Sequence, residues 1–188
     1  GLAAQSIVAF NADLIRAVAA QSGTVQVATI NYHNFKEFGN RGGNHTIGDA
    51  YIRALANRLH QIAEEMALDP NEFRIYHRSG KSFKLLYTGS KKNAVHQVLA
   101  TLHSQQSREA IYNEVRNQFG TTLVGPPGIA NQINFYSGHA TCQPGLDNGM
   151  PIDIAKELND ASVSAAKFAQ LRWFENPDEG ILPPLEYT

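Results

Sequence analysis

The side chains with the most evident chemistry lie in one basic segment of the chain. Between Phe73 and Ser107 the sequence has no Asp or Glu, but it has six Lys or Arg residues. Such a segment attracts phosphate groups or an acidic surface, and it cannot assemble a cation site from its own side chains. A solvated face around a basic hairpin is the alternative interpretation. The six residues are Arg74, Arg78, Lys81, Lys84, Lys91 and Lys92.

Gly80-Lys81-Ser82, inside this segment, matches the end of a phosphate-binding P-loop. The complete motif needs a glycine five residues before Gly80, and Ile75 occupies that position. The flanking residues favour strands on both sides, so no helix begins at Lys81 to present its amides to a phosphate. We therefore do not expect a P-loop.

The histidines and the single cysteine are weaker signals. His96 and His103 would share one face of a helix, but no acid adjoins them, which favours a surface pair over a metal site. Cys142 has no activating partner close by in the sequence. One cysteine also excludes an internal disulfide framework and a multi-cysteine zinc site.

Length and composition indicate one well-cored domain. The chain has 188 residues, of which 43% are hydrophobic, and a formal net charge of -1. No apolar stretch approaches the roughly 20 residues that a membrane-spanning helix needs. No signal peptide is visible, and with so little cysteine we expect a cytoplasmic location. We expect a single domain over residues 1–173, followed by a Pro-rich, acidic C-terminal strap or linker over residues 174–188.

Apolar periodicity and turn residues predict the elements that must position these side chains. Residues 33–48 are polar and glycine-rich and predict a loop. The order predicts an α+β fold in which a central, mainly antiparallel sheet is flanked by helices. The predicted helices are 5–20, 49–66, 91–103, 107–119 and 154–169, and the predicted strands are 24–31, 73–78, 82–88, 121–124 and 131–141.

Two motifs in these elements resemble the GGDEF family of diguanylate cyclases. The first is Asn31-Tyr32-His33-Asn34-Phe35-Lys36, followed by a glycine-rich loop and by His45-Thr46-Ile47-Gly48-Asp49 at a helix start. The second is Arg78-Ser79-Gly80-Lys81-Ser82-Phe83, in the hairpin turn where the family carries its Arg-Gly-Gly-Asp/Glu-Glu-Phe signature. The resemblance covers residues 5 to 173 and implies a palm-like, nucleotidyl-cyclase-like fold.

The departures from the family pattern concern its catalytic acids. The resemblance implies two carboxylates that hold a divalent metal ion, which bridges the triphosphate of GTP. The first-strand position is Asn31, the metal position in the turn is Lys81, and the adjacent catalytic position is Ser82. Replacing an acid by a lysine turns attraction for a divalent ion into repulsion, so catalysis by this mechanism should be absent.

The guanine-recognition residues are only partly retained. Because the loop has one extra residue, the family's base-recognising asparagine corresponds to either Gly39 or Asn40. Asp49 matches the acid that contacts the guanine edge, although a helix N-cap explains Asp49 equally well. The inhibitory Arg-x-x-Asp motif is missing, because the corresponding residues are Pro70-Asn71-Glu72-Phe73. The sequence therefore does not support feedback binding of cyclic di-GMP.

The leading hypothesis is a catalytically inactive GGDEF-like domain of a larger protein. It would act as a bacterial-type signalling module that regulates, binds a nucleotide or contacts a protein partner. We expect no cofactor, although lysine as the counter-charge to phosphate would allow GTP or another purine nucleotide to bind without metal. The candidate nucleotide-binding residues are Asn31, Asn34, Asn40, Asp49, Ser79, Gly80 and Lys81.

Two alternatives stay open. One is residual diguanylate cyclase or related phosphoryl-transfer activity on GTP, which needs a metal ligand such as Glu37 or Asp49. The other is binding of nucleic acid or an acidic partner by a basic surface on the hairpin, where steep salt dependence would be expected. The basic-surface residues are Arg74, Arg78, Lys84, Lys91 and Lys92.

Overall fold

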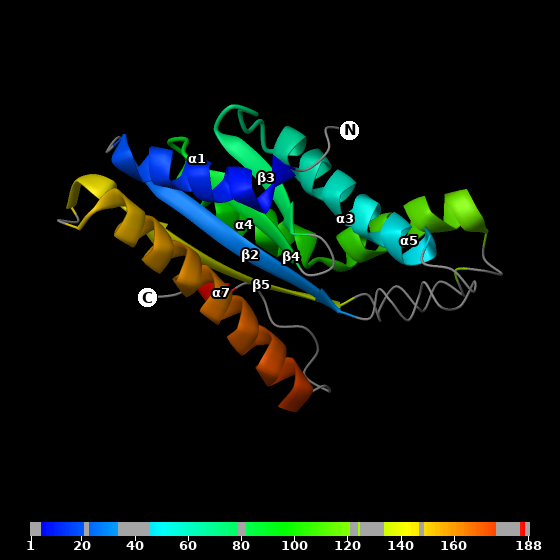
Figure 1. Cartoon of the computed structure of the whole chain (residues 1–188). Helices are drawn as coiled ribbons and strands as arrows, with labels where there is room; N and C mark the ends of the chain where they lie inside the picture. Colours follow the sequence, from blue (N-terminus) through cyan, green and yellow to red (C-terminus); the bar gives the residue numbers. More distant parts are fainter. Residues whose placement is uncertain are drawn as a thin grey trace.

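The computed structural model of the protein describes residues 5–20, 23–33, 46–78, 82–120, 124, 134–146, 149–175 and 185–186. A six-stranded sheet with the order β1-β3-β4-β2-β5-β6 runs through this part of the chain (Figure 1). Its four longer strands pair antiparallel, and the two short edge strands pair in parallel. The strands are β1 (Gln5–Ser6), β2 (Val25–His33), β3 (Phe73–Arg78), β4 (Ser82–Tyr87), β5 (Asn134–Cys142) and β6 (Leu185–Glu186).

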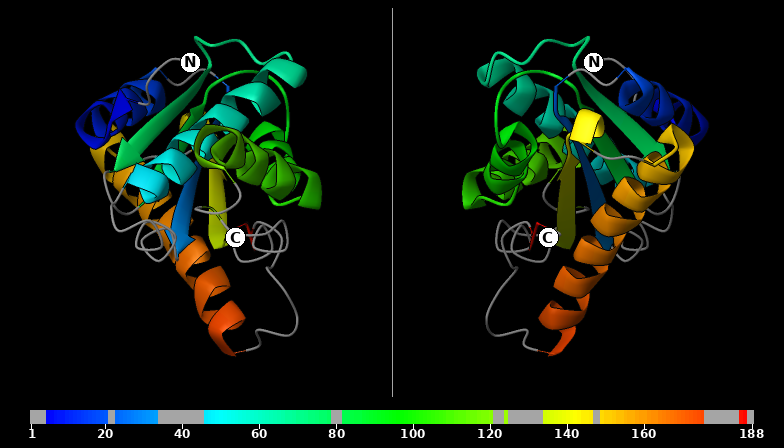
Figure 2. Two further views of the ribbon diagram at one scale, coloured as in Figure 1. Left: turned by 90° about the vertical axis from the view of Figure 1, so that its right-hand side faces the viewer. Right: turned by 90° about the vertical axis from the view of Figure 1, so that its left-hand side faces the viewer.

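Helices cover both faces of the sheet, which confirms the predicted α+β architecture. One face packs against α3, α4 and α5, and the other packs against α1 and α7 (Figures 1 and 2). A short 3-10 turn, η2 (Pro144–Leu146), follows β5. The helices are α1 (Ile7–Ala19), α3 (Thr46–Glu65), α4 (Ala94–Leu102), α5 (Gln105–Phe119) and α7 (Pro151–Glu175).

The helices form where apolar spacing and capping residues agree. In α3, Leu55, Leu59 and Ile62 recur at three- and four-residue steps, and all are buried. Ser6 caps α1, because its hydroxyl accepts a hydrogen bond from the amide of Ala9 at 3.3 Å. Such caps satisfy amides that have no partner within the helix, and they fix where the helix begins.

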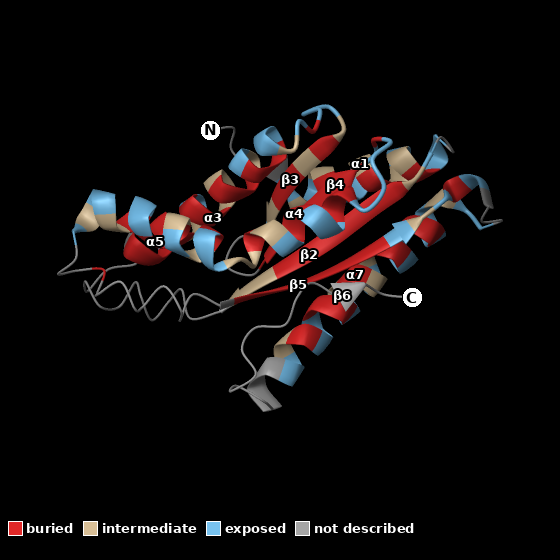
Figure 3. Cartoon of the chain, turned by 180° about the vertical axis from the view of Figure 1, so that it is seen from behind, coloured by how far each residue is buried: buried red, intermediate tan, exposed pale blue. Residues whose placement is uncertain are grey.

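The larger core lies between the sheet and α3, α4 and α5. It is almost wholly apolar and includes Ile30, Phe83 and Leu85 from the strands. The smaller core lies under α1 and α7 and includes Phe10 and Val27. Figure 3 shows buried residues along the central strands and on the inner faces of the helices.

Helix α7 packs directly against the backbone of Gly138 in β5. A Cβ atom at this position would lie 2.5 Å from the Cβ of Ala165 and would also collide with the backbone nitrogen of Ala166. The absence of a side chain at Gly138 therefore sets the distance between α7 and the sheet.

Three details differ from the sequence-based expectations. The last helix is longer than predicted and runs from Pro151 to Glu175. Val124 is helical rather than extended, and its amide lies 3.2 Å from the carbonyl oxygen of Gly120. Within the C-terminal tail, β6 pairs with Gly138 and His139 of β5. Among the described helices, none is long and apolar enough to cross a membrane.

Candidate functional site

The two motif-bearing strands meet at one end of the sheet. Asn31, near the end of β2, is the register partner of Ser82 at the start of β4 and of Tyr136 on β5. Asn31 is half-buried and Ser82 is buried. The structure therefore places an amide next to a hydroxyl at the two positions where the family pattern has carboxylates.

Asp49 lies in the first turn of α3 and is exposed. The helix begins at Thr46, so Asp49 is not its N-cap, and the capping interpretation is wrong. An acid within the first turn is still favoured by the helix dipole. The exposure of Asp49 leaves its carboxylate accessible to solvent.

Five of the seven candidate nucleotide-binding residues lie outside the described residues, and so does the alternative metal ligand Glu37. The five are Asn34, Asn40, Ser79, Gly80 and Lys81. Their role stays a prediction, although Lys81 directly precedes Ser82 in the chain.

An aromatic cluster of Tyr32, His77 and Phe83 lies on the opposite face of the sheet from Asn31 and was not identified as a unit from the sequence. The ring of His77 stacks on Phe83 with 4.6 Å between centroids. The hydroxyl of Tyr32 lies 3.2 Å from Nε2 of His77. Burial lowers the pKa of His77, which favours its neutral form. Alternation along β2, β3 and β4 could have indicated this cluster, since all three residues point to the same face.

The proposed basic surface is smaller than the sequence suggests. Arg78, Lys91 and Lys92 are exposed, and the ammonium of Lys91 donates to the carbonyl oxygen of Met66 at 2.6 Å. Arg74 forms an ion pair with Asp13 of α1 at 3.2 Å. Only part of the positive charge of this segment is therefore available to a partner.

Lys84 is not a surface residue, and its assignment to the basic surface is wrong. Lys84 is 4% exposed because α1 covers this face of β4 and Asn159 of α7 bonds to its ammonium. The ammonium donates to Thr29 Oγ1 at 2.7 Å and to Asn159 Oδ1 at 2.9 Å, and it lies 5.9 Å from the ring centroid of Phe10. Burial lowers the pKa of Lys84 to about 8, with a further contribution from Arg78.

A second polar cluster lies beside Lys84 on the same face of the sheet. Tyr76 is the register partner of Lys84, and its hydroxyl donates to Asp13 at 2.7 Å. Burial and the charge of Asp13 raise the pKa of Tyr76. Asp13 also accepts from Arg16 and Arg74, each at 3.2 Å. These contacts attach α1 to the edge of the sheet.

The predicted surface pair of histidines on α4 is wrong for one member. His96 is exposed, and its Nδ1 lies 3.1 Å from Nε2 of His139. His103 instead packs on Phe135 and bonds to the hydroxyl of Ser137 at 2.8 Å. Burial lowers the pKa of His103 to about 3. Among the described residues, no group of three His, Cys, Asp or Glu side chains could hold a metal ion.

A divalent ion of the kind that the fold implies does not fit the donors described at the strand ends. Mg²⁺ binds through anionic oxygens and phosphates. Asn31 and Ser82 offer neutral oxygens, and the residue between Gly80 and Ser82 is a lysine.

Comparison with solved structures identifies the fold. No protein-family model matches the sequence, and no curated protein matches it. The GGDEF domain of DgcB from Caulobacter crescentus, solved in complex with c-di-GMP, matches with a TM-score of 0.60 at 20% identity. That match covers 95% of this chain and 88% of the other.

Two further structures agree with this result. The active GGEEF domain of a diguanylate cyclase from Vibrio cholerae has a TM-score of 0.60 at 14% identity, covering 98% of this chain and 97% of that one. A microbial GGDEF domain solved with bis-(3′,5′)-cyclic di-GMP has a TM-score of 0.53 at 18% identity. That match covers 95% of this chain and 87% of the other. The chain therefore has the fold of GGDEF domains, and the predicted resemblance is confirmed at the level of the fold.

Proposed function

We propose that this protein is a catalytically silent GGDEF-like domain that acts as a regulatory, nucleotide-binding module of a larger protein. The observation that carries the proposal is the pairing of Asn31 with Ser82, next to Lys81, at the end of the sheet. In the resemblance these are the three positions of the metal-binding and catalytic acids.

Charge makes the loss of metal binding severe. A unit-charge pair about 4 Å apart contributes about 4 kcal/mol at an effective dielectric constant of about 20. A lysine in place of a carboxylate reverses the sign of this contribution, and Asn31 and Ser82 add no negative charge. Without a bound divalent ion, the charge that develops on the transferred phosphoryl group loses its main stabilisation.

Two features support retention of a nucleotide. The carboxylate of Asp49 is exposed in the first turn of α3 and can accept hydrogen bonds from the N1 and N2 groups of guanine. The ammonium of Lys81 is a point charge suited to phosphate. Together they favour GTP or another purine nucleotide, bound without metal.

Calorimetric titration with GTP in EDTA tests the binding part of this proposal. We expect weak binding that is lost in Asp49→Ala and weakened in Lys81→Ala, with Lys92→Ala as the matched surface control. No heat at millimolar GTP would contradict the nucleotide-binding role. Equal binding by all the variants would place the nucleotide elsewhere.

The basic surface is a less supported alternative. Lys84 is buried, Arg74 is paired with Asp13, and Lys91 donates to the carbonyl oxygen of Met66. Three of the five predicted members are therefore engaged within the protein. Contact with other domains of the parent chain or with a protein partner remains part of the proposal.

A further inference from the structure

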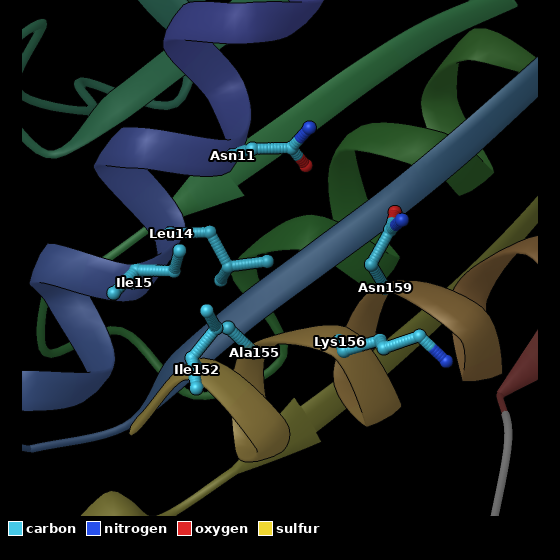
Figure 4. Close-up of a pocket in the computed structure, with 7 residues that line it drawn as sticks. All are labelled: Asn11, Leu14, Ile15, Ile152, Ala155, Lys156 and Asn159. Atoms are coloured by element: carbon cyan, nitrogen blue, oxygen red, sulfur yellow. The ribbon is translucent and has the colours of Figure 1, made fainter. Parts of the chain in front are cut away.

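A groove lies between α1 and α7 (Figure 4). Its volume is about 220 Å³, and both apolar and polar side chains line it. The lining residues are Asn11, Leu14, Ile15, Ile152, Ala155, Lys156 and Asn159. In Figure 4 the apolar residues gather between the two helices, and Asn11 and Asn159 lie at the other end.

Lys84 lies directly behind Asn159 and has no anionic hydrogen-bond partner. Its ammonium has three N–H donors, and its two hydrogen bonds go to Thr29 and Asn159, both neutral. A buried charge is costly unless a charge of opposite sign compensates for it. Within the described part of the chain, no carboxylate lies within ion-pair distance of Lys84. The charge of Asp160 acts on Lys84 from a greater distance and opposes the lowering of its pKa by burial and by Arg78.

Asn159 connects this charge to the groove. Its Oδ1 accepts from Lys84 at 2.9 Å, so its Nδ2 group is left as a donor for another acceptor. Hydrogen-bonded groups in series polarise one another, which strengthens the Nδ2 donor. The amide of Asn11 reaches toward the same end of the groove from α1 (Figure 4).

We propose that this groove binds a small amphipathic carboxylate. The anionic oxygens of the ligand accept hydrogen bonds from the amides of Asn11 and Asn159. The positive charge of Lys84 compensates for the negative charge of the carboxylate. Its alkyl chain lies on Leu14, Ile15 and Ile152. Ile152 is 60% exposed, so the chain would cover apolar surface that now faces solvent.

The dimensions and the charge favour a short monocarboxylate. The groove volume of about 220 Å³ is below the roughly 300–1,000 Å³ of clefts that hold drug-sized ligands, which favours a small molecule. A single buried ammonium and two amides suit one negative charge better than the multiple charges of a phosphate. The rim lysine, Lys156, is bonded to Asp160 at 3.4 Å and points away from the groove in Figure 4.

Titration of the protein with pentanoate, followed by amide chemical shifts, tests the proposal. We expect saturable binding with a Kd of about 1 mM, with the largest shifts in α1 and α7. Pentanamide, which has the same shape and no charge, should bind at least tenfold more weakly. Equal binding of pentanoate and pentanamide would overturn the assignment of charge recognition, and no saturable binding would overturn the site.

Variants separate the roles of the residues. Lys84→Met keeps the apolar stem, removes the charge, and should weaken pentanoate binding at least tenfold while leaving pentanamide unchanged. Asn11→Ala, at an exposed position, should weaken pentanoate binding without disturbing the fold. Lys92→Met is the matched control and should bind as the parent protein does. Unchanged affinity in both Lys84→Met and Asn11→Ala would contradict the proposal.

Discussion

The two faces of the sheet are held to their helices in different ways. Under α3, α4 and α5, the contact is an almost continuous apolar core built around Ile30, Phe83 and Leu85. Under α1 and α7, apolar packing is interrupted by a polar row across three strands, formed by Tyr76, Lys84 and Thr29. Each member of this row bonds to a helix: Tyr76 to Asp13 of α1, and Lys84 and Thr29 to Asn159 and Ser162 of α7.

The two faces therefore have different roles: one contributes most of the stability, and the other specifies where its helices lie. Apolar burial contributes most of the folding free energy, and it tolerates small changes of packing. The polar row adds little net stability, but it leaves costly unpaired groups if α1 or α7 shifts along the sheet. We infer that the row fixes the positions of α1 and α7, and that the opposite face holds the domain together.

A side chain inserted between α7 and the sheet should lower the stability of the protein more than any other change described below. Gly138→Val places side-chain atoms where the backbone of Ala166 and the Cβ of Ala165 now lie. We expect a loss of more than about 3 kcal/mol in the free energy of unfolding, measured by urea titration. Thr141→Val on the exposed end of the same strand is the matched control. A stable Gly138→Val protein would show that α7 packs less closely than described.

Lowering the pH should destabilise the folded protein because His103, which packs on the face covered by α3, α4 and α5, resists protonation. The folded-state pKa is about 3 and the unfolded value is about 6.5, so the unfolded chain binds more protons between these limits. Stability therefore falls as the pH drops below about 6.5. Between pH 6.5 and 4, the free energy of unfolding should fall by about 3 kcal/mol less in His103→Gln than in the parent protein. Parallel stability curves for the two proteins would refute a half-buried, neutral His103.

Raising the pH should increase the stability of the folded protein because buried Lys84, on the face covered by α1 and α7, loses its proton more readily than in the unfolded chain. The folded-state pKa is about 8, below the ordinary 10.5, so the folded protein releases this proton first as the pH rises. Stability therefore rises by about 2 kcal/mol between pH 7.5 and 9.5, before tyrosines titrate. Lys84→Met should lack this rise, and urea titrations across the range would detect it. The same slope in both proteins would contradict a charged, buried Lys84.

The smallest expected effect concerns the attachment of α1. Asp13→Asn weakens the acceptor for Tyr76, Arg16 and Arg74 and should cost about 1 kcal/mol in thermal or urea unfolding. Arg16→Ala, at a side chain that is 76% exposed, should cost less than about 0.5 kcal/mol. If the two variants were equally stable, the cluster would not help to attach α1.

Sequence reasoning predicted those parts of the fold that depend on local pattern. The stripe of α3 and the hairpin of β3 and β4 follow from the spacing of apolar residues and from the turn at Ser79 and Gly80. The buried state of Lys84 could not be predicted in this way. All of β4 is buried because helices cover both faces of the sheet. A lysine that the sequence pattern predicts to be exposed to solvent is therefore buried.

Partners that are distant in sequence explain the remaining errors. Asn159 is 75 positions from Lys84, and Ser137 is 34 positions from His103. No periodicity connects such pairs. At the candidate site, Asn31 and Ser82 are register partners, so the two motifs meet in the sheet. The roles that the resemblance implies for these residues stay predictions. The roles of the residues between Asn34 and His45 stay predictions.

We propose above that this GGDEF-like domain carries no cyclase activity. The most direct measurement is incubation of the protein with GTP and either Mg²⁺ or Mn²⁺, followed by chromatography of the nucleotides. We expect unchanged GTP and no cyclic di-GMP with either ion. Cyclic di-GMP that accumulates with time and disappears in Asp49→Ala would contradict it.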